Sequence, residues 1–290
     1  MTAILHLSDL HIGNDKRRDQ HAKTLVAIIK ERWSGADKPL LLVTGDFVDD
    51  GRESQYRVAG RLVNELRQAG FTLLALPGNH DYGWNGNRAT PRCFNRFRRH
   101  LLGGSQVSYP EVMETRDGSA IVLLNSMQSE CGFWDGLLAN GELGGEQLGK
   151  LRDTLAALQA RRAEGAKVIV ALHHHSFLFP NDGVIHRTFE RLGHFLKDAT
   201  AFLETIAGPP PLIDALLFGH EHRHTDFSKD YPLANLPAKY GIPTLLCCGS
   251  STIPDAQTGA FPAWLLTLDQ GALRVENPEL APPSPMLPIG

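Results

Sequence analysis

The chain has 290 residues, of which 42% are hydrophobic and 21% charged, as in an ordinary globular protein. This composition excludes a collagen-like, a coiled-coil or a wholly disordered chain. With 29 Lys and Arg against 32 Asp and Glu, the net charge of −3 disfavours nucleic acid as a partner, and it also disfavours a polybasic membrane binder. No apolar run approaches the ~20 residues that a bilayer requires, so we expect no membrane span.

The N-terminus and the cysteines indicate the compartment. Asp9 and His11 interrupt the position where the apolar region of a signal peptide would lie. The four cysteines form no CxxC pair, which argues against a disulfide framework and against a structural zinc knuckle. We therefore expect a cytoplasmic protein with reduced thiols.

Short apolar runs alternate with segments of helical periodicity. The runs predict strands at residues 3–7, 40–44, 71–76, 120–124, 167–172, 212–218, 244–248, 264–268 and 273–275. Apolar residues at helical spacing predict helices around residues 22–33, 59–66, 148–158 and 196–206. This alternation predicts an α/β fold with a mainly parallel sheet, and the closely spaced C-terminal strands predict some antiparallel pairing. Residues 1–276 are expected to form one domain, followed by a proline-rich C-terminal tail at 277–290.

Polar residues of chemical interest follow five of the predicted strands directly. The five segments are Ser8-Asp9-Leu10-His11, Gly45-Asp46-Phe47-Val48-Asp49, Gly78-Asn79-His80-Asp81, His173-His174-His175 and Gly219-His220-Glu221-His222. In open α/β sheets, ligands bind outside the carboxyl ends of the strands. We therefore expect the five segments to converge on one edge.

The residue types in these segments point to metal binding. Carboxylate and amide oxygens with imidazole nitrogens, and no thiolate, suit Mn, Fe or Zn. The D-x-H and H-x-H spacings put two ligands on one side of an extended segment. Seven candidate ligands are too many for one tetrahedral zinc and suit two metals about 3.5–4 Å apart. Each segment alone is common in turns, but the five in order at strand ends are specific.

As a set, the segments resemble the motifs of the calcineurin-like metallophosphoesterases over residues 9–222. The resemblance implies a four-layer α/β/β/α sandwich of two mixed sheets with two divalent cations (Mn, Fe or Zn) at the C-terminal strand ends. It implies that the first metal is held by Asp9, His11, Asp46 and His222. It implies that the second is held by Asp46, Asn79, His173 and His220, so that Asp46 bridges the two.

The resemblance also assigns roles near the metals. His173 is taken as the ligand because the family's ligand is the first residue after the strand, and His174 and His175 are expected to lie behind the ligands or in solvent. Two cations lower the pKa of a shared water, and the resulting hydroxide attacks phosphorus. His80 is the predicted proton donor to the leaving oxygen. Asp49 is predicted to orient His80, with a simple turn role beside a glycine as the alternative.

Departures from the family's subgroups indicate the substrate class. Asp50 stands where phosphoprotein phosphatases carry a phosphate-binding Arg, and His80 stands where the lipid-A-pathway pyrophosphate hydrolases carry Arg. The motifs are most similar to those of bacterial phosphodiesterases. We therefore predict a phosphodiesterase acting on a small anionic substrate of the nucleotide or glycerophosphodiester type. The alternatives are a phosphomonoesterase or a nuclease of the same superfamily. A non-catalytic interaction module is a further alternative, although it would be expected to lose ligands that this chain retains.

Two segments outside the motifs are candidate substrate contacts. No acidic residue occurs from Tyr82 to Pro110, and arginines at positions 88, 92, 96 and 99 would line one face of a helix. Arg92 and Arg96 are therefore predicted to bind anionic groups of the substrate, with a solvated basic helix as the alternative. In the second segment, residues 176–197, the candidates are His186 and Arg187.

Overall fold

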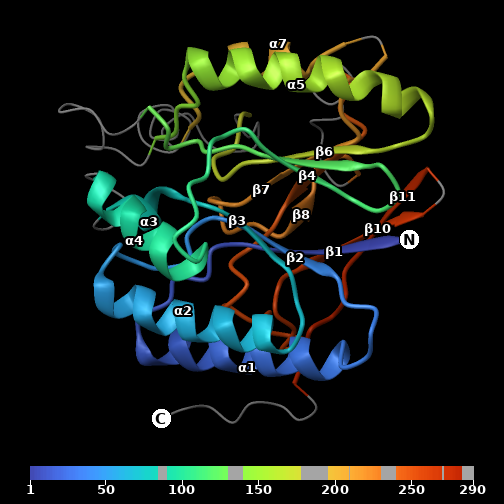
Figure 1. Cartoon of the computed structure of the whole chain (residues 1–290). Helices are drawn as coiled ribbons and strands as arrows, with labels where there is room; N and C mark the ends of the chain where they lie inside the picture. Colours follow the sequence, from blue (N-terminus) through green and yellow to red (C-terminus); the bar gives the residue numbers. More distant parts are fainter. Residues whose placement is uncertain are drawn as a thin grey trace.

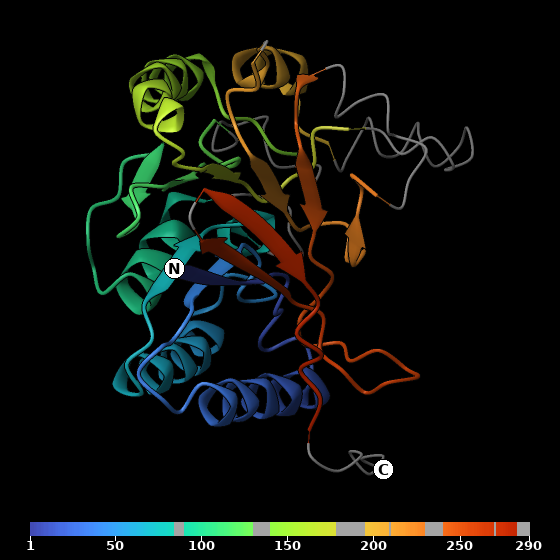
Figure 2. The same cartoon turned by 90° about the vertical axis from the view of Figure 1, so that its right-hand side faces the viewer.

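The computed structural model describes residues 1–83, 90–129, 140–177, 195–208, 210–229, 240–269 and 271–282. Two mixed sheets lie face to face, and helices cover both outer faces (Figures 1 and 2). This is the four-layer α/β/β/α arrangement that the family resemblance implied. No helix of the described residues is long and apolar enough to cross a membrane.

The first sheet has the strand order β11-β10-β1-β2-β3. Its strands are β1 (Thr2–Leu7), β2 (Leu40–Thr44), β3 (Leu73–Leu76), β10 (Trp264–Asp269) and β11 (Ala272–Glu276). β1, β2 and β3 are parallel, whereas β10 runs antiparallel to both β1 and β11. The helices α1 (Lys16–Arg32) and α2 (Glu53–Gln68) connect the parallel strands and cover the outer face in Figure 1.

The second sheet has the strand order β4-β5-β6-β7-β9-β8. Its strands are β4 (Glu111–Glu114), β5 (Ala120–Leu123), β6 (Val168–Ala171), β7 (Ala215–Phe218), β8 (Thr225–Asp226) and β9 (Thr244–Cys247). The four inner strands are parallel, and the edge strands β4 and β8 are antiparallel. α5 (Gly145–Ala163) and α7 (Ala199–Ile206) cover its outer face in Figure 1. Two further helices, α3 (Asn79–Tyr82) and α4 (Pro91–Leu101), follow β3.

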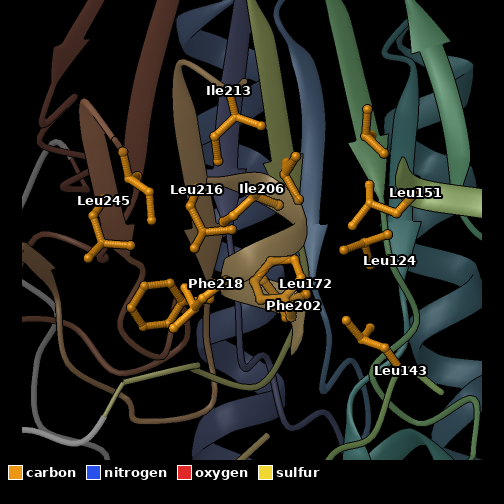
Figure 3. Packing of buried hydrophobic residues seen from close by; sticks show 14 of the residues in the cluster. Leu124, Leu143, Leu151, Leu172, Phe202, Ile206, Ile213, Leu216, Phe218 and Leu245 are labelled. Carbon is orange, nitrogen blue, oxygen red and sulfur yellow. The ribbon is translucent and has the colours of Figure 1, made fainter. Parts of the chain in front are cut away.

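Side chains that point alternately to the two faces of each strand contribute to three apolar layers, one between the sheets and one between each sheet and its helices. On β2, Leu41 and Val43 pack toward α1 and α2, while Leu42 packs between the sheets. On β7, Leu216 and Phe218 pack toward α5 and α7 (Figure 3). Successive strand side chains point to opposite faces, so a strand covered on both sides is apolar throughout. This explains why the sequence shows continuous apolar runs rather than alternation.

The observed elements differ from the predicted ones at the edges of the second sheet and at the C-terminus. The sequence analysis did not predict β4 or β8, which have four and two residues and lie at the sheet edges. Residues 277–282, assigned to the tail, contact the domain in the structure. Leu280 is fully buried, and its carbonyl accepts a hydrogen bond from Phe261 N at 2.9 Å. The domain boundary at residue 276 stays a prediction.

The burial of Leu280 yields a test of this contact. Leu280→Ala should lower the free energy of unfolding by about 2–5 kcal/mol, the usual cost of truncating a buried leucine. Ile253→Ala, at a side chain that is 46% exposed, is the control and should have little effect. Urea denaturation of both variants measures the difference. Equal stability of the Leu280 variant and the wild type would show that residues 277–282 do not belong to the folded unit.

Candidate metal centre

The five predicted segments meet at the carboxyl ends of β1, β2, β3, β6 and β7, near α3 in Figure 1. β1, β2 and β3 are neighbours in the first sheet, and β6 and β7 are neighbours in the second. The two sheets contribute to one cluster, because Asp46 Oδ2 lies 3.3 Å from His173 Nε2 and Asp9 Oδ1 lies 3.3 Å from His222 Nε2. The face-to-face packing of the sheets therefore assembles the site.

The candidate ligand atoms include two groups of three, and the Asp46 carboxylate lies close to a histidine of each. Asp9, His11 and His222 place one ligand atom each within 4.8 Å of one another, and Asp9, Asp46 and His173 do the same. Asp46 Oδ2 lies 3.7 Å from His11 Nε2 in the first group and 3.3 Å from His173 Nε2 in the second. This is the placement that a bridging ligand requires.

Asn79 and His220 complete the second group. Asn79 Oδ1 lies 3.0 Å from His173 Nε2 and 3.1 Å from His220 Nδ1. The structure thus brings all seven predicted ligands together. Imidazole nitrogens face each other at 3.0 Å between His11 and His222, and at 3.2 Å between His173 and His220. Imidazole nitrogens and carboxylate oxygens that converge in this way suit divalent cations, which accept lone pairs from both.

Backbone strain marks the same residues. Within the described residues, six non-glycine residues have a positive φ, and five of these are predicted ligands. The φ angles are 54° at Asp9, 44° at His11, 52° at Asp46, 71° at His220 and 52° at His222. Each left-handed residue costs about 1–3 kcal/mol and persists only where its surroundings fix it. Strain concentrated on the ligands is typical of a functional site.

Glycines precede three of the ligands because a side chain would overlap the site. A Cβ atom on Gly78 would overlap Asp46 Oδ1. A Cβ atom on Gly219 would overlap Ser8 Oγ and lie 2.5 Å from Asp9 Oδ2. The glycines of these motifs therefore let the backbone of one strand end approach the carboxylate of another.

The two inner carboxylates are buried and ionised. Burial by itself would raise the pKa of Asp9 and of Asp46, which are 0% and 1% exposed. The neighbouring histidines outweigh burial, His222 for Asp9 and His173 for Asp46, and hold both pKa values below the usual range. In turn, burial lowers the pKa of His173, but Asp46 overcomes it and raises that pKa to about 9. The site concentrates negative charge that positive charge must balance.

His80 and Asp49 lie beside the ligands, but their contact differs from the expected one. His80 Nδ1 donates to the main-chain carbonyl of Asp49 at 2.6 Å, and this contact does not involve Nε2. The Asp49 carboxylate lies 3.1 Å from His11 Nδ1 and accepts from Asn14 Nδ2 at 2.9 Å. Asp49 thus holds His80 through its backbone and orients the ligand His11 through its side chain.

Sequence reasoning missed the role of Asp81, which is fully buried behind the ligands. Its carboxylate accepts hydrogen bonds from Phe47 N at 3.2 Å, from Val48 N at 3.3 Å and from Gly78 N at 3.1 Å. Burial, followed by repulsion from Asp46, raises the pKa of Asp81 to about 7. Asp81 ties the loop after β2 to the turn after β3. The only signal in the sequence was a carboxylate directly after His80.

His174 and His175 are both buried and support the site from behind. His174 Nδ1 lies 2.7 Å from Ser126 Oγ, and His175 Nδ1 lies 3.2 Å from Glu221 Oε1. These contacts fix the loop after β6 against two neighbouring segments. The structure excludes the expected solvent location for both, and it places a His174 nitrogen within 4.8 Å of nitrogens of His173 and His220.

The structure describes two of the four residues predicted to contact the substrate. Arg92 and Arg96 belong to α4, and Arg96 Nη1 donates to the carbonyl of Gly51 at 2.8 Å, two residues beyond Asp49. His186 and Arg187 lie outside the described residues.

Solved structures share this fold. A dimetal phosphatase from Danio rerio matches 97% of this chain and 96% of its own, with a TM-score of 0.67 at 12% identity. The purple acid phosphatase PPD1 of yellow lupin seeds matches 96% of this chain and 51% of its own, with a TM-score of 0.57 at 12% identity. At these identities the likeness establishes the fold, which is that of dimetal phosphohydrolases.

Sequence comparison establishes the family. The model of the calcineurin-like phosphoesterases matches residues 2–224, and the chain belongs to this family. It is therefore a metal-dependent phosphoester hydrolase of a family that uses a binuclear metal centre. A subunit of the nuclease SbcCD from Escherichia coli K12 is 29% identical over 121 residues, which are 40% of this chain and 30% of that protein. Its counterpart from strain O157:H7 matches equally. The chain thus spans less than a third of these relatives.

The shared position of Asp46 gives a test. Asp46→Asn should bind fewer than two metals per chain and lose activity, because a neutral amide bridges two cations poorly. Asp50→Asn removes a neighbouring carboxylate that pairs with Arg52 and is the matched control. Elemental analysis after loading with Mn²⁺ measures the metal content. An Asp46 variant that keeps two metals and full activity would refute the bridging role.

The buried position of Asp81 gives a second test. Asp81→Ala leaves three buried N–H groups without their acceptor, and each such loss costs about 1–3 kcal/mol. The free energy of unfolding should therefore fall by at least about 3 kcal/mol. Asp81→Asn retains one acceptor oxygen and should lose less. Urea denaturation compares the variants, and an alanine variant as stable as the wild type would contradict the assignment.

Proposed function

We propose that the protein is a phosphodiesterase that uses two divalent metals, Mn, Fe or Zn, on a small anionic substrate. The observation that carries the proposal is the position of Asp46 Oδ2, 3.7 Å from His11 Nε2 and 3.3 Å from His173 Nε2, with the partly exposed His80 nearby. When bound, the two cations supply a water of lowered pKa and neutralise charge on the phosphoryl oxygens. The seven ligands are Asp9, His11, Asp46, Asn79, His173, His220 and His222.

His80 is the proposed proton donor to the leaving oxygen. Its side chain is 22% exposed, so a substrate can reach it. The hydrogen bond from Nδ1 to the carbonyl of Asp49 does not involve Nε2, and as a proton donor His80 would act from its imidazolium form, which carries a proton on Nε2 as well as on Nδ1. His80 N also donates to Asp46 Oδ1 at 2.9 Å, which keeps the imidazole next to the shared ligand.

Charge at the edge of the site supports a diester over a monoester. A phosphomonoester dianion needs more positive charge around it than a diester monoanion. Asp49 and Asp50 are partly exposed beside the ligands, and Asp50 stands where a phosphate-binding Arg would help a dianion. The Asp49 carboxylate and the lack of that Arg favour the substrate that carries less charge.

A nuclease is the second candidate. The partial similarity to a component of a nuclease favours it, and so do the arginines of α4 close to Asp49. Membership of a family of metal-dependent phosphoester hydrolases argues against the non-catalytic module, and so does the retention of the candidate ligands and His80.

A substrate panel tests the proposal. The protein is stripped with a chelator, reloaded with Mn²⁺, and assayed with bis-p-nitrophenyl phosphate and with p-nitrophenyl phosphate. We expect a higher kcat/KM for the diester. A higher value for the monoester would identify a phosphomonoesterase, and turnover of neither ester by the metal-loaded protein would contradict the enzyme proposed.

The role of His80 has its own test. His80→Ala should retain both metals and lower kcat by a factor of about 10²–10⁴ for an alkyl leaving group, which needs a proton. The decrease should be smaller for p-nitrophenolate, which leaves without one. Elemental analysis and the ratio of the two rates check this. Loss of metal together with activity would make His80 a ligand instead, and equal decreases for both leaving groups would exclude a proton donor.

A further inference from the structure

The outer face of α2 and α4 carries a groove lined mainly by arginines. The two helices lie against each other in Figure 1. Two cavities of about 430 Å³ and about 380 Å³ lie along them and share Arg57 and Arg99, so they adjoin. We call this surface the basic groove; its arginines are Arg57, Arg61, Arg67, Arg92, Arg96 and Arg99.

Close helix packing creates the groove. A Cβ atom on Gly60 of α2 would lie 3.3 Å from the carbonyl of His100, so glycine lets α4 approach α2 closely. Gly51, in the loop before α2, has a φ of 62°, and a Cβ atom there would lie 3.0 Å from Cys93 Sγ of α4. Arginines from both helices therefore reach one surface, beginning at the loop that carries Asp49.

The groove has a large excess of positive charge. Its lining contains six arginines and a single carboxylate, Glu53. Glu53 lies within 4.0 Å of Arg57, Arg96, Arg99 and His100, so one negative charge is shared among them. Within the described part of the chain, no carboxylate pairs with Arg61 or Arg92. Arginines held together in this way favour an anion that brings several negative charges.

The length of the groove indicates the anion. Glu53 and Arg67 are fourteen residues apart on one helix, which is about 21 Å at 1.5 Å per residue. A single phosphate or a cyclic nucleotide would fill only one cavity. A nucleic-acid strand, with a phosphate about every 3.4 Å along its axis in a duplex, would present about six phosphates over this length.

We propose that the basic groove binds the phosphate backbone of a nucleic-acid strand and leads that strand toward the metal centre. Arg96 Nη1 contacts Gly51, two residues from Asp49, so the groove begins beside the proposed catalytic histidine. The net charge of −3 does not oppose this binding, because the positive charge is concentrated on one face. That the strand is also a substrate rests on the second candidate function, a nuclease that uses the same metal centre; the binding itself does not.

Binding to an oligonucleotide tests the groove. The probe is a fluorescein-labelled phosphorothioate 15-mer, which keeps one negative charge per linkage, and fluorescence anisotropy with the Mn²⁺-loaded protein gives Kd. Arg57→Gln with Arg99→Gln removes the two arginines shared by both cavities. We expect Kd to rise at least about tenfold, since each charged hydrogen bond removed is worth about that factor. The slope of log K against log salt should also become shallower, by about 0.7 for each phosphate that is no longer neutralised.

A matched control removes the same charge elsewhere. The double variant Arg152→Gln with Arg161→Gln changes two exposed arginines of α5, which lies on the opposite outer layer. Its Kd should stay within about twofold of the wild-type value, because exposed charges farther than a Debye length from the groove are screened. If the groove variant does not fold, Arg61→Gln with Arg92→Gln replaces it, because these side chains form no ion pair in the described part of the chain. A groove variant that binds like the control would refute the proposal.

The wild-type protein separates this proposal from the proposed function. Turnover of bis-p-nitrophenyl phosphate reports on the metal centre alone. Groove-dependent binding without turnover would overturn the enzyme function and leave the groove intact. Turnover with binding that does not depend on the groove arginines would overturn the groove and leave the enzyme function intact.

Discussion

Two carboxylates in the interior, Asp9 and Asp46, need positive charge next to them, and the other features of the site follow from this need. A buried unpaired carboxylate is strongly destabilising, and here histidines from the opposite sheet supply the balancing charge. Bringing those histidines close requires five left-handed residues and glycines that leave no Cβ atom between the strand ends. Divalent cations would replace the protonated imidazoles as the balancing charge. The left-handed residues thus lie where the proposed metal centre needs them.

Much of the fold was predictable because apolar runs reveal strands that are covered on both faces. β2 was predicted with its observed bounds, whereas the strand predicted from residue 212 begins only at Ala215. Asp214 explains the difference, since it accepts from Val168 N at 2.8 Å and pairs with Arg162, so the chain turns there before the strand begins. The division into two sheets could not be read from periodicity, because both sheets have the same pattern. It followed only from the family resemblance.

The convergence of the seven candidate ligands was predictable from the sequence because their residue types are distinctive and each lies close after a strand, while their role as ligands stays a prediction. The supporting contacts were not, because they join segments that only the packing brings together. Asp81 accepts a hydrogen bond from the loop after β2, 34 residues away in the sequence. Asp49 contacts His11 through its carboxylate but His80 through its main-chain carbonyl. The arginine segment lacks acidic neighbours in the sequence, yet it finds Glu53 on α2 in the fold. Ion pairs between residues far apart in the sequence cannot be predicted from the spacing of residues along the chain.

Anomalous diffraction from crystals of the Mn²⁺-loaded protein tests directly whether one carboxylate joins two metals. We expect two peaks about 3.5–4 Å apart at the carboxyl ends of the central strands. The Asp46 carboxylate should contact both metals, either through one shared oxygen or through one oxygen each. The first peak should also contact His11 and His222, and the second should contact Asn79 and His173. A single peak, or two peaks of which only one contacts Asp46, would contradict the arrangement described above.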